Sequence, residues 1–592
     1  MALHVGGVVR AGGTVTSCTE ASLRAAMAGG GTVTFACDGT ITLGNTLSNS
    51  LNTVLDGSGH QITISGGGTV QVFYVNNNTS LTLSNLTIAN GYSVGAFATT
   101  SFGPDDPNLV GRGGGILNQG NLLLANCVFI NNQAIGGYVF MGYGGSGQGG
   151  AIFNMGTNVI DNCVFGKNSA SGGNGGSPNY GFSAGGGGYA EGGVIYNEGS
   201  LTITRSSFTN NSAYGRDGAA AQGQPNSVGG ITGGSGGAAN GGAIYNSGSL
   251  LLQSSTVAVN TTSGGGGGTG GPGPNTVISD GSNGYGGTGG SGGSGSGAIF
   301  NAGIANLVNV TVALNGTAGG GGGQGGTGGA NLVQHPDWPG GSGGTGGAGG
   351  RGSGGIQDTS GFLRMTNCTV VSNAGVGGSG GSGGSGGVGT APDYPLGPTG
   401  SVGTSGTAVG GVKTIGCVLA NTLLASNNPA NWSGTITDAG HNLSSDASCV
   451  FTGTGSRTNI NPMLGPLANN GGPTLTMTLL PGSPAIDAGS ATGAPATDQR
   501  GVPRPQGPGV DIGAFEFQYL PFFTGVAIRN ATNCQLQMAG LLPNQSFTVQ
   551  ASSNLVSWFT VTNFIFGTNG VFQFVDPVPT NCRTRFYRFS TP

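Results

Sequence analysis

One short phrase recurs along this 592-residue chain and constrains its fold more than any other feature. The copies read GGGILN at 113–118, GGAIFN at 149–154, GGVIYN at 192–197, GGAIYN at 241–246 and SGAIFN at 296–301, with a weaker GGIQD that ends at Asp358. Fourteen residues after each of the first five copies stands a second asparagine, and apolar residues alternate between the two with the period of a β-strand. A register that stays constant while the copies move apart predicts stacked repeats of one structural unit.

These repeats predict an all-β fold, a parallel β-helix, because each coil can place the same side chain on its neighbour. Phe129, Phe165 and Phe208 share one position and should stack in the interior. Asparagines at equivalent turns can bond their own backbone and the asparagine one coil away, which makes a ladder. The expected ladder residues are Asn118, Asn154, Asn197, Asn246 and Asn301 in one column, and Asn132, Asn168, Asn211, Asn260, Asn315 and Asn373 in the other.

The region before the first phrase should form the first coils and a cap. Residues 15–91 contain short strand patterns, whereas 18–30 has the one helical pattern, with Leu23, Ala26 and Met27 on one face. A short helix there would cover the open end of the hydrophobic column.

Composition excludes several partner classes. Only 6% of the residues are charged, and the 16 basic residues are scattered, so neither nucleic acid nor an anionic membrane is an expected partner. No apolar run approaches the roughly 20 residues that span a bilayer, so no transmembrane segment is expected. Simple disorder fits badly, because it requires high charge and the apolar fraction here is 36%.

Glycine, with 132 residues, is concentrated in insertions that follow the second asparagine column. They cover roughly 137–148, 170–191, 213–240, 262–296, 316–353 and 374–410, grow along the chain, and should emerge along one edge. Two interpretations remain open: flexible linkers, or an ordered lobe of polyproline II helices, whose three-residue period matches GGSGGSGGSGG at 377–387. Aromatic residues that would mark such a lobe and could bind a partner are Tyr138, Phe140, Tyr180, Phe182, Tyr285 and Trp338.

A catalytic site is not expected. Acidic residues in the coils are isolated, and Asp56 in a DG turn needs no chemistry to explain it. The densest charged cluster has Arg500 and Arg504 among its acids, which favours ion pairs that close the last coil. Calcium binding is the weaker alternative, with Asp487, Asp498, Asp511 and Glu516 as candidate ligands. No cofactor is expected.

Two further expectations concern single residue types. Nine cysteines allow two local disulfides, Cys18 with Cys37 and Cys534 with Cys582. An ice-binding surface would require a flat, regular array of threonines, and the threonines keep no fixed column in the sequence.

From about residue 518 the sequence changes to the alternating pattern of β-strands. The chain is therefore expected to divide into a β-helix with its insertions at 1–517 and a small β-sandwich at 518–592. The sandwich resembles immunoglobulin or fibronectin-like modules, with Trp558 and Phe574 expected in its core.

Three segments resemble bacterial surface-protein families. SCTEASLRAAMAGGGTVTFACDGTITL (17–43) resembles the opening of CSLREA-type proteins, and the GGAIYN-type phrases with FTNN (208–211) resemble polymorphic outer-membrane repeats. PLANNGGPTLTMTLLPGSPAIDAG (466–489), with the sequence that follows it, resembles the choice-of-anchor Q region. We therefore expect residues 461–517 to form a segment that closes the β-helix. The resemblance implies a secreted or surface-attached right-handed β-helix, located outside the cell.

The function expected from the sequence is a noncatalytic extracellular scaffold or adhesin. Its glycine-rich lobe would contact a surface, a glycan or a neighbouring copy of the chain. The alternatives are a filament subunit, since stacked coils have ends that can join, and a carbohydrate-active enzyme of the pectin lyase-like kind.

Overall fold

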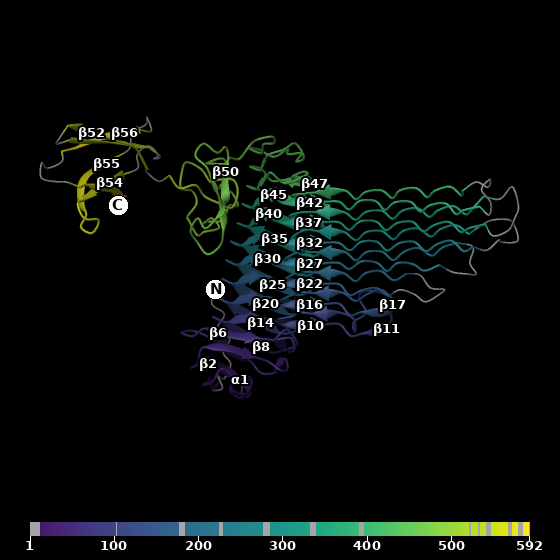
Figure 1. Ribbon diagram of the computed structural model, residues 1–592. Helices are drawn as coiled ribbons and strands as arrows, with labels where there is room; N and C mark the ends of the chain where they lie inside the picture. Colours follow the sequence, from purple (N-terminus) through teal and green to yellow (C-terminus); the bar gives the residue numbers. More distant parts are fainter. Residues whose placement is uncertain are drawn as a thin grey trace.

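The structure is a computed structural model that describes residues 12–592 except 102, 177–183, 224–228, 276–283, 332–338, 390–395, 520–521, 531–532, 540–545, 566–570, 578–583 and 591–592. Three long parallel sheets stack coil on coil and form the predicted parallel β-helix (Figure 1). Among the described residues, no helix is long and apolar enough to cross a membrane.

Each coil between the two ends of the β-helix contributes one strand to each of the three sheets. The 12-stranded sheet contains β1 (Thr14–Val15), β2 (Gly31–Phe35), β5 (Thr53–Asp56), β8 (Ser80–Ser84), β14 (Asn121–Ala125), β20 (Thr157–Asp161), β25 (Ser200–Thr204), β30 (Ser249–Gln253), β35 (Ile304–Val308), β40 (Leu363–Thr366), β45 (Cys417–Ala420) and β48 (Ile436–Asp438). The 11-stranded sheet contains β3 (Gly39–Thr42), β6 (Ile62–Ser65), β9 (Thr87–Ala89), β15 (Val128–Ile130), β21 (Val164–Gly166), β26 (Ser207–Thr209), β31 (Thr256–Ala258), β36 (Thr311–Ala313), β41 (Thr369–Val371), β46 (Leu423–Ala425) and β49 (Leu443–Ser444). The 10-stranded sheet contains β4 (Leu47–Asn49), β7 (Phe73–Val75), β13 (Ile116–Asn118), β19 (Ile152–Asn154), β24 (Ile195–Asn197), β29 (Ile244–Asn246), β34 (Ile299–Asn301), β39 (Ile356–Asp358), β44 (Val412–Lys413) and β47 (Trp432–Ser433).

The interior of the β-helix is filled by side chains that repeat from coil to coil. Phe129, Phe165 and Phe208 are fully buried, and their rings stack with centroids 4.9 and 4.7 Å apart. Residues of equal type pair directly across neighbouring strands, so that the side chain of one coil packs on the same side chain of the next coil. The predicted phenylalanine stack is therefore confirmed.

Helix α1 (Glu20–Met27) covers the first coils, as predicted. Thr19 caps it by accepting a hydrogen bond from the Ser22 N–H at 3.3 Å, and Leu23 is fully buried. A disulfide joins Cys18 to Cys37 beside the helix, which confirms one of the two predicted pairs. Cys582 of the other pair lies outside the described residues. The free cysteines among the described residues, Cys127, Cys163, Cys368, Cys417 and Cys449, are all buried.

Two shorter sheets lead from the coils into the glycine-rich insertions. One contains β10 (Tyr92–Val94), β16 (Gln133–Ile135), β22 (Ser169–Ser171), β27 (Ser212–Tyr214), β32 (Thr261–Ser263), β37 (Gly316–Ala318) and β42 (Ala374–Val376). The other contains β12 (Gly111–Arg112), β18 (Gly147–Gln148), β23 (Ala190–Glu191), β28 (Ala239–Asn240), β33 (Gly295–Ser296), β38 (Gly352–Ser353) and β43 (Ala408–Val409). A small pair, β11 (Ala98–Ser101) and β17 (Val139–Gly142), lies in the first insertions. All insertions leave the β-helix on the same side (Figure 1).

The segment 461–517, with β50 (Leu464–Ala468) and β51 (Thr476–Leu479), does more than close the last coil. It covers the outer face of the 11-stranded sheet from β31 onward, where Met477, Leu479 and Ile512 pack against Val371 and Leu423. The Gln499 side chain bonds Thr256 at 2.8 Å and Thr311 at 2.6 Å, which lie on successive coils. The expectation of a simple closure was too narrow, because the strands TVA, TVA and TVV of β31, β36 and β41 are buried on both faces and need this cover.

The C-terminal module consists of two three-stranded antiparallel sheets. One contains β52 (Phe522–Asn530), β53 (Asn533–Ala539) and β56 (Val571–Pro577), and the other β55 (Phe559–Ile565), β54 (Ser546–Ser552) and β57 (Phe586–Ser590). Leu536 and Val549 form its buried centre, with Phe574 packed against them as predicted. Trp558 is not in this cluster: its ring lies under the Arg588 guanidinium, 4.3 Å from the centroid, so its assignment to the core was wrong.

Candidate interaction surface

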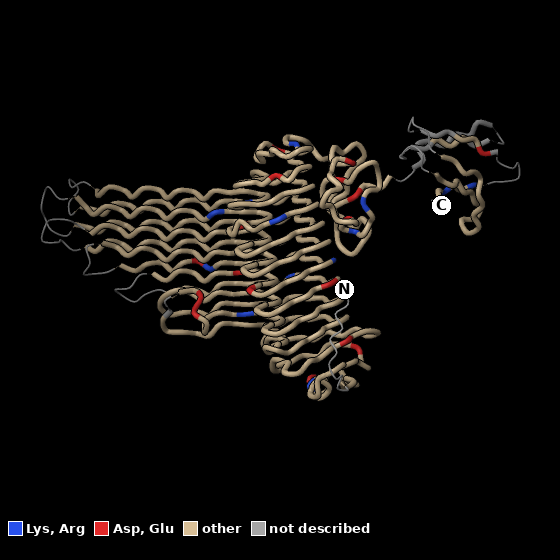
Figure 2. Tube along the Cα trace, turned by 180° about the vertical axis from the view of Figure 1, so that it is seen from behind, with Lys and Arg blue, Asp and Glu red and all other residues tan. Residues whose placement is uncertain are grey.

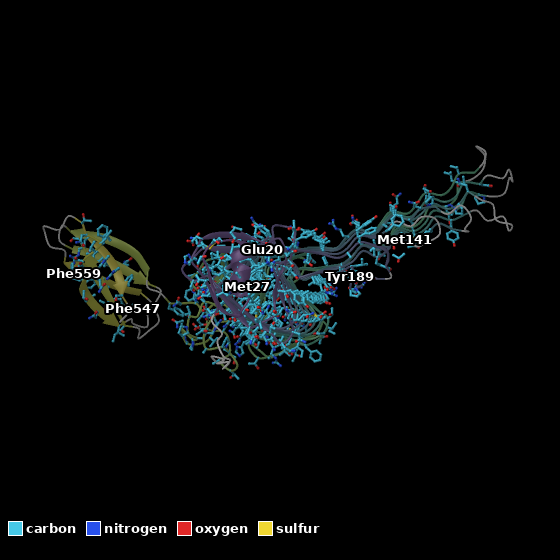
Figure 3. All side chains as sticks on the ribbon, turned by 90° about the horizontal axis from the view of Figure 1, so that it is seen from below. Glu20, Met27, Met141, Tyr189, Phe547 and Phe559 are labelled. Atoms are coloured by element: carbon cyan, nitrogen blue, oxygen red, sulfur yellow. A yellow bond between two sulfur atoms is a disulfide. The ribbon has the colours of Figure 1, made fainter. Side chains whose placement is uncertain are left out.

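The glycine-rich insertions form one ordered body, which we call the glycine lobe. In each of the four longest insertions an outward limb runs away from the β-helix and a return limb runs back to it. The described outward limbs are 215–223, 264–275, 319–331 and 377–389, and the return limbs are 229–238, 284–294, 339–351 and 396–407. They lie side by side in Figure 1, and the view from below in Figure 3 shows that the lobe is thin.

Backbone hydrogen bonds join these limbs in two directions. Gly322 donates to the Ser379 carbonyl of the next outward limb at 2.8 Å, and Gly323 donates to Gly290 of a return limb, also at 2.8 Å. The same pair of bonds recurs three residues later at Gly325 and Gly326. Three residues per turn with every bond made to another limb is the arrangement of packed polyproline II helices. The ordered alternative, rather than the flexible linker, therefore describes these limbs.

Glycine is required inside the lobe because the limbs touch backbone to backbone. A Cβ built at Gly323 would collide with the Gly268 carbonyl oxygen, and one at Gly322 with the Gly347 carbonyl oxygen. Outward limbs form one layer and return limbs the other, so two of every three residues face another limb. The third residue of each triplet lies on an outer face of the lobe, where its side chain can contact a partner.

The outer face of the return layer carries a regular array of small hydroxyl groups. Thr232, Thr288 and Thr345 are exposed and occupy equivalent positions on successive coils, and the Thr232 and Thr288 Oγ1 atoms lie 2.9 Å apart. The equivalent row one triplet nearer the β-helix consists of Ser235, Ser291, Ala348 and Thr404. The expectation that threonines keep no fixed column is wrong for this face, because backbone hydrogen bonds align limbs whose separation in the sequence varies.

The lobe faces carry almost no charge. In the described parts of the eight limbs the charged residues are Arg216, Asp217 and Arg351 (Figure 2). Of the predicted aromatic residues, Tyr138, Phe140 and Tyr285 are 46%, 43% and 52% exposed. Only Tyr285 of these three lies on a long limb. Tyr180, Phe182 and Trp338 lie outside the described residues.

A buried polar and aromatic seam lies where the lobe joins the β-helix. Glu191 accepts a hydrogen bond from Gln148 at 2.8 Å, and burial raises the pKa of its carboxyl to about 7. Beside it runs an aromatic stack with centroids 4.7 to 5.1 Å apart, made by Phe153, Tyr196, Tyr245 and Phe300. Sequence reasoning missed this stack, although its signal was present: an aromatic residue before the final asparagine in four phrases.

Both asparagine columns form hydrogen-bonded ladders. In the first, each Nδ2 donates to the Oδ1 one coil further on, from Asn118 to Asn154 at 2.6 Å and on to Asp358, which replaces asparagine. In the second, Asn168 and its successors bond in the same way, and each also donates to a main-chain carbonyl of the preceding coil. The first ladder consists of Asn118, Asn154, Asn197, Asn246, Asn301 and Asp358, and the second consists of Asn132, Asn168, Asn211, Asn260, Asn315, Asn373, Asn427 and Asn431. These residues hold coils together and point to no ligand.

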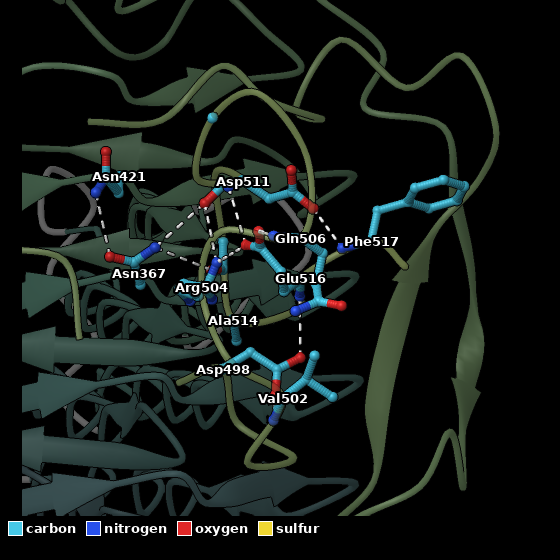
Figure 4. A network of polar contacts seen from close by, with 12 residues as sticks. Asn367, Asn421, Asp498, Val502, Arg504, Gln506, Asp511, Ala514, Glu516 and Phe517 are labelled. Atoms are coloured by element: carbon cyan, nitrogen blue, oxygen red, sulfur yellow. Dashed lines mark hydrogen bonds and ion pairs between the residues drawn. The ribbon is translucent and has the colours of Figure 1, made fainter. Parts of the chain in front are cut away.

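The acidic cluster of the closing segment is occupied by protein partners (Figure 4). Arg504 and Glu516 are both 1% exposed and form an ion pair at 2.6 Å, while Arg500 pairs with Asp498 at 2.7 Å. The Asp511 carboxylate accepts hydrogen bonds from the main-chain N–H groups of Asp487 and Phe517, and burial followed by the nearby Glu516 charge raises its pKa to about 7. Asp487 accepts from the Gly509 N–H and the Tyr519 hydroxyl. Among the described residues, no group of three or more His, Cys, Asp or Glu is placed to hold a metal ion.

A groove on the early coils holds the nearest arrangement to a catalytic pair. Asp38 and His60 line it, with Oδ2 and Nδ1 3.4 Å apart. The Gln61 N–H, and then His60, lower the Asp38 pKa, so this carboxyl stays ionised and is a poor general acid. Asp56 has its pKa lowered mainly by the Ser58 hydroxyl within its own turn. Both carboxyls therefore accept hydrogen bonds from the protein and have lowered pKa values, so neither is suited to act as a general acid.

Comparisons with models of protein families, with curated proteins and with solved structures found no match to this chain.

Proposed function

We propose that this chain is a noncatalytic extracellular scaffold or adhesin whose glycine lobe makes the contact with a surface, a glycan or a neighbouring chain. The observation that carries the proposal is the ordered lobe itself. Its limbs are bonded in two directions, so its outer faces present their side chains on a stiff support and binding would cost little conformational entropy. A flexible linker would not offer such a face.

Several features support an extracellular location. The Cys18–Cys37 disulfide is typical of an oxidising compartment. The opening, repeat and closing segments resemble those of bacterial surface proteins. We therefore propose that this β-helix is a bacterial surface protein. The low charge of the lobe favours a neutral partner, because it offers almost no ionic contacts.

The two alternatives have less support. A carbohydrate-active enzyme that works by acid catalysis needs a carboxyl that holds a proton, whereas the pKa values of both Asp38 and Asp56 are lowered. A filament built end to end needs a free first coil, whereas α1 packs there through Leu23.

A glycan array and pull-down on insoluble neutral polysaccharides test the proposal. For any ligand found, Thr288→Glu with Thr345→Glu places charge on the return face, and Thr269→Glu with Thr327→Glu does so on the outward face. We expect one pair to reduce binding at least tenfold and the other pair to serve as its control. Silence on both assays, or binding that neither pair changes, would contradict a lobe-mediated contact with a glycan.

The threonine column favours one second candidate, an ice surface. Thr232, Thr288 and Thr345 form part of the flat, regular array that such a surface requires. Thermal hysteresis measured with ice crystals present separates the two candidates: a freezing-point depression that Thr288→Glu abolishes supports ice binding, and its absence in the wild-type protein removes this candidate.

A further inference from the structure

The glycine lobe ends at its last pair of limbs, and this edge differs from every earlier limb boundary. In the return limb 339–351, three glycines face the outward limb of the next coil. A Cβ built at Gly346 would collide with the Gly381 carbonyl oxygen, and Gly343 and Gly349 meet Gly384 and Gly378 in the same way. Contact with the following outward limb therefore requires glycine at these three positions.

The two preceding return limbs obey the same requirement. Their equivalent residues are all glycine, and each would place a Cβ on a carbonyl oxygen of the next outward limb. The pairs are Gly286, Gly289 and Gly292 against Gly326, Gly323 and Gly320, and Gly230, Gly233 and Gly236 against Gly271, Gly268 and Gly265.

The last return limb breaks the pattern at these positions only. Hydrogen bonds from Gly343, Gly346 and Gly349 to Pro398, Ser401 and Thr404 set its register. This register places Thr399, Val402 and Ser405 where the earlier limbs have glycine, and all three are exposed. The other glycines of the limb are kept, because a Cβ at Gly400 or Gly403 would collide with the preceding return limb. The change from a GGX to a GXY pattern thus falls where the next outward limb would lie.

Among the described residues, the neighbouring outward limb has unpaired backbone groups at the same edge of the lobe. In the limb before it, Gly322, Gly325 and Gly328 donate to carbonyls of the limb 377–389. The equivalent N–H groups, those of Gly380, Gly383 and Gly386, have no acceptor within the part of the chain that the structure describes. A row of unpaired donors is a ready template for another chain.

We propose that Thr399, Val402 and Ser405 are caps that close the lobe to a further glycine-rich limb, and that the limb excluded is one from a second copy of this chain. A docking limb would need glycine at two of every three positions and a carbonyl opposite each free N–H. The outward limbs of this protein have that pattern, for example 377–387. The caps occupy the seat of such a limb with three Cβ atoms, as solenoids protect their terminal repeats.

The test compares the wild-type chain with Thr399→Gly/Val402→Gly/Ser405→Gly. The matched control is Ser401→Gly/Thr404→Gly/Thr407→Gly, which removes three side chains from the same limb but on its outer face. Sedimentation velocity across a concentration series measures self-association, and a labelled peptide GGSGGSGGSGG reports capture of a limb. Hydrogen exchange of Gly400 and Gly403 shows whether the last limb stays ordered in each variant.

We expect only the cap variant to associate or to bind the peptide, at least tenfold more tightly than the wild type. A cap variant that stays monomeric and ignores the peptide while its last limb remains protected would overturn the proposal, as would equal peptide binding by the wild type or the control. If the triple substitution exposes the last limb to exchange, Val402→Gly/Ser405→Gly decides, because it opens two adjacent glycine positions, which the shorter peptide GGSGGSG can occupy. Failure of this double variant to bind the shorter peptide also overturns the proposal.

Discussion

The β-helix and the glycine lobe are built from the same coils but exclude water by opposite means. The β-helix packs large side chains such as Phe165 into a continuous interior, whereas the lobe has no side-chain interior and its limbs meet through backbone atoms. Removing side-chain atoms should therefore destabilise the β-helix, whereas adding them should destabilise the lobe. Close packing can come from complementary side chains or from their absence.

The largest effect should follow from removing an interior side chain of the β-helix. Phe165→Ala leaves a cavity between Phe129 and Phe208, and we expect it to lower the free energy of unfolding by about 3–5 kcal/mol. The urea midpoint followed by circular dichroism measures this loss. A midpoint within error of the wild type would mean that the stack contributes little to the packing.

Adding one carbon atom to the lobe should cost about 1–3 kcal/mol, the usual effect of overpacking. Gly347→Ala places a methyl group on the Gly290 carbonyl oxygen, so the amides of adjacent limbs should lose protection from hydrogen exchange. Thr345→Ala, two residues away on the outer face, is the control and should change stability by less than about 0.5 kcal/mol. Equal effects of the two substitutions would refute the requirement for glycine.

Substitution of one polar residue in the interior of the β-helix should raise its stability. Asn158 is fully buried between Leu122 and Leu201 of neighbouring coils, and its side-chain atoms have no hydrogen-bond partner among the described residues. Asn158→Leu removes an unsatisfied polar group from an apolar column, so we expect a gain of about 1–3 kcal/mol. A lower urea midpoint in this variant would show that the asparagine has a partner worth more than the apolar contact.

The junction of the two regions should respond to pH. Burial raises the Glu191 pKa to about 7 from the 4.5 of the free group, so the folded state binds its proton more tightly. This contribution to stability is fully present below pH 4.5 and is lost as the pH rises through 7. Melting temperatures of Glu191→Gln should fall less between pH 5 and pH 8 than those of the wild type, while the exposed Glu198→Gln should follow the wild type. Parallel curves for all three proteins would contradict the assignment.

Much of the β-helix could be predicted from the sequence, because its evidence is local and repeated. Each coil carries its own asparagines and its own phenylalanine position, so one alignment of phrases predicted the phenylalanine stack. The helix that contains Leu23 was predicted separately, from the apolar face of residues 18–30. The second aromatic stack through Tyr196 was missed, since its residues were read as variants within the phrase.

The candidate surface was only partly predictable. The three-residue period indicated limbs, but it could not say which limb lies beside which or which residues reach a face. Tyr138 and Phe140 were chosen as aromatic markers and lie on the short early insertions, whereas the threonine column at Thr288 was not expected. Equivalent positions on neighbouring limbs are separated by unequal lengths of chain, so composition alone does not reveal the register.

By itself, the sequence determined the repeating coil, its buried columns and the side on which the glycine insertions leave it, because these features depend on residues within one coil. Tertiary structure decided the two layers of limbs, the position of Val402 at the last edge of the lobe and the path of the closing segment. Contacts such as Gln499 with Thr256 join residues 243 positions apart and have no local pattern. Their geometry exists only once the coils have stacked and aligned the limbs.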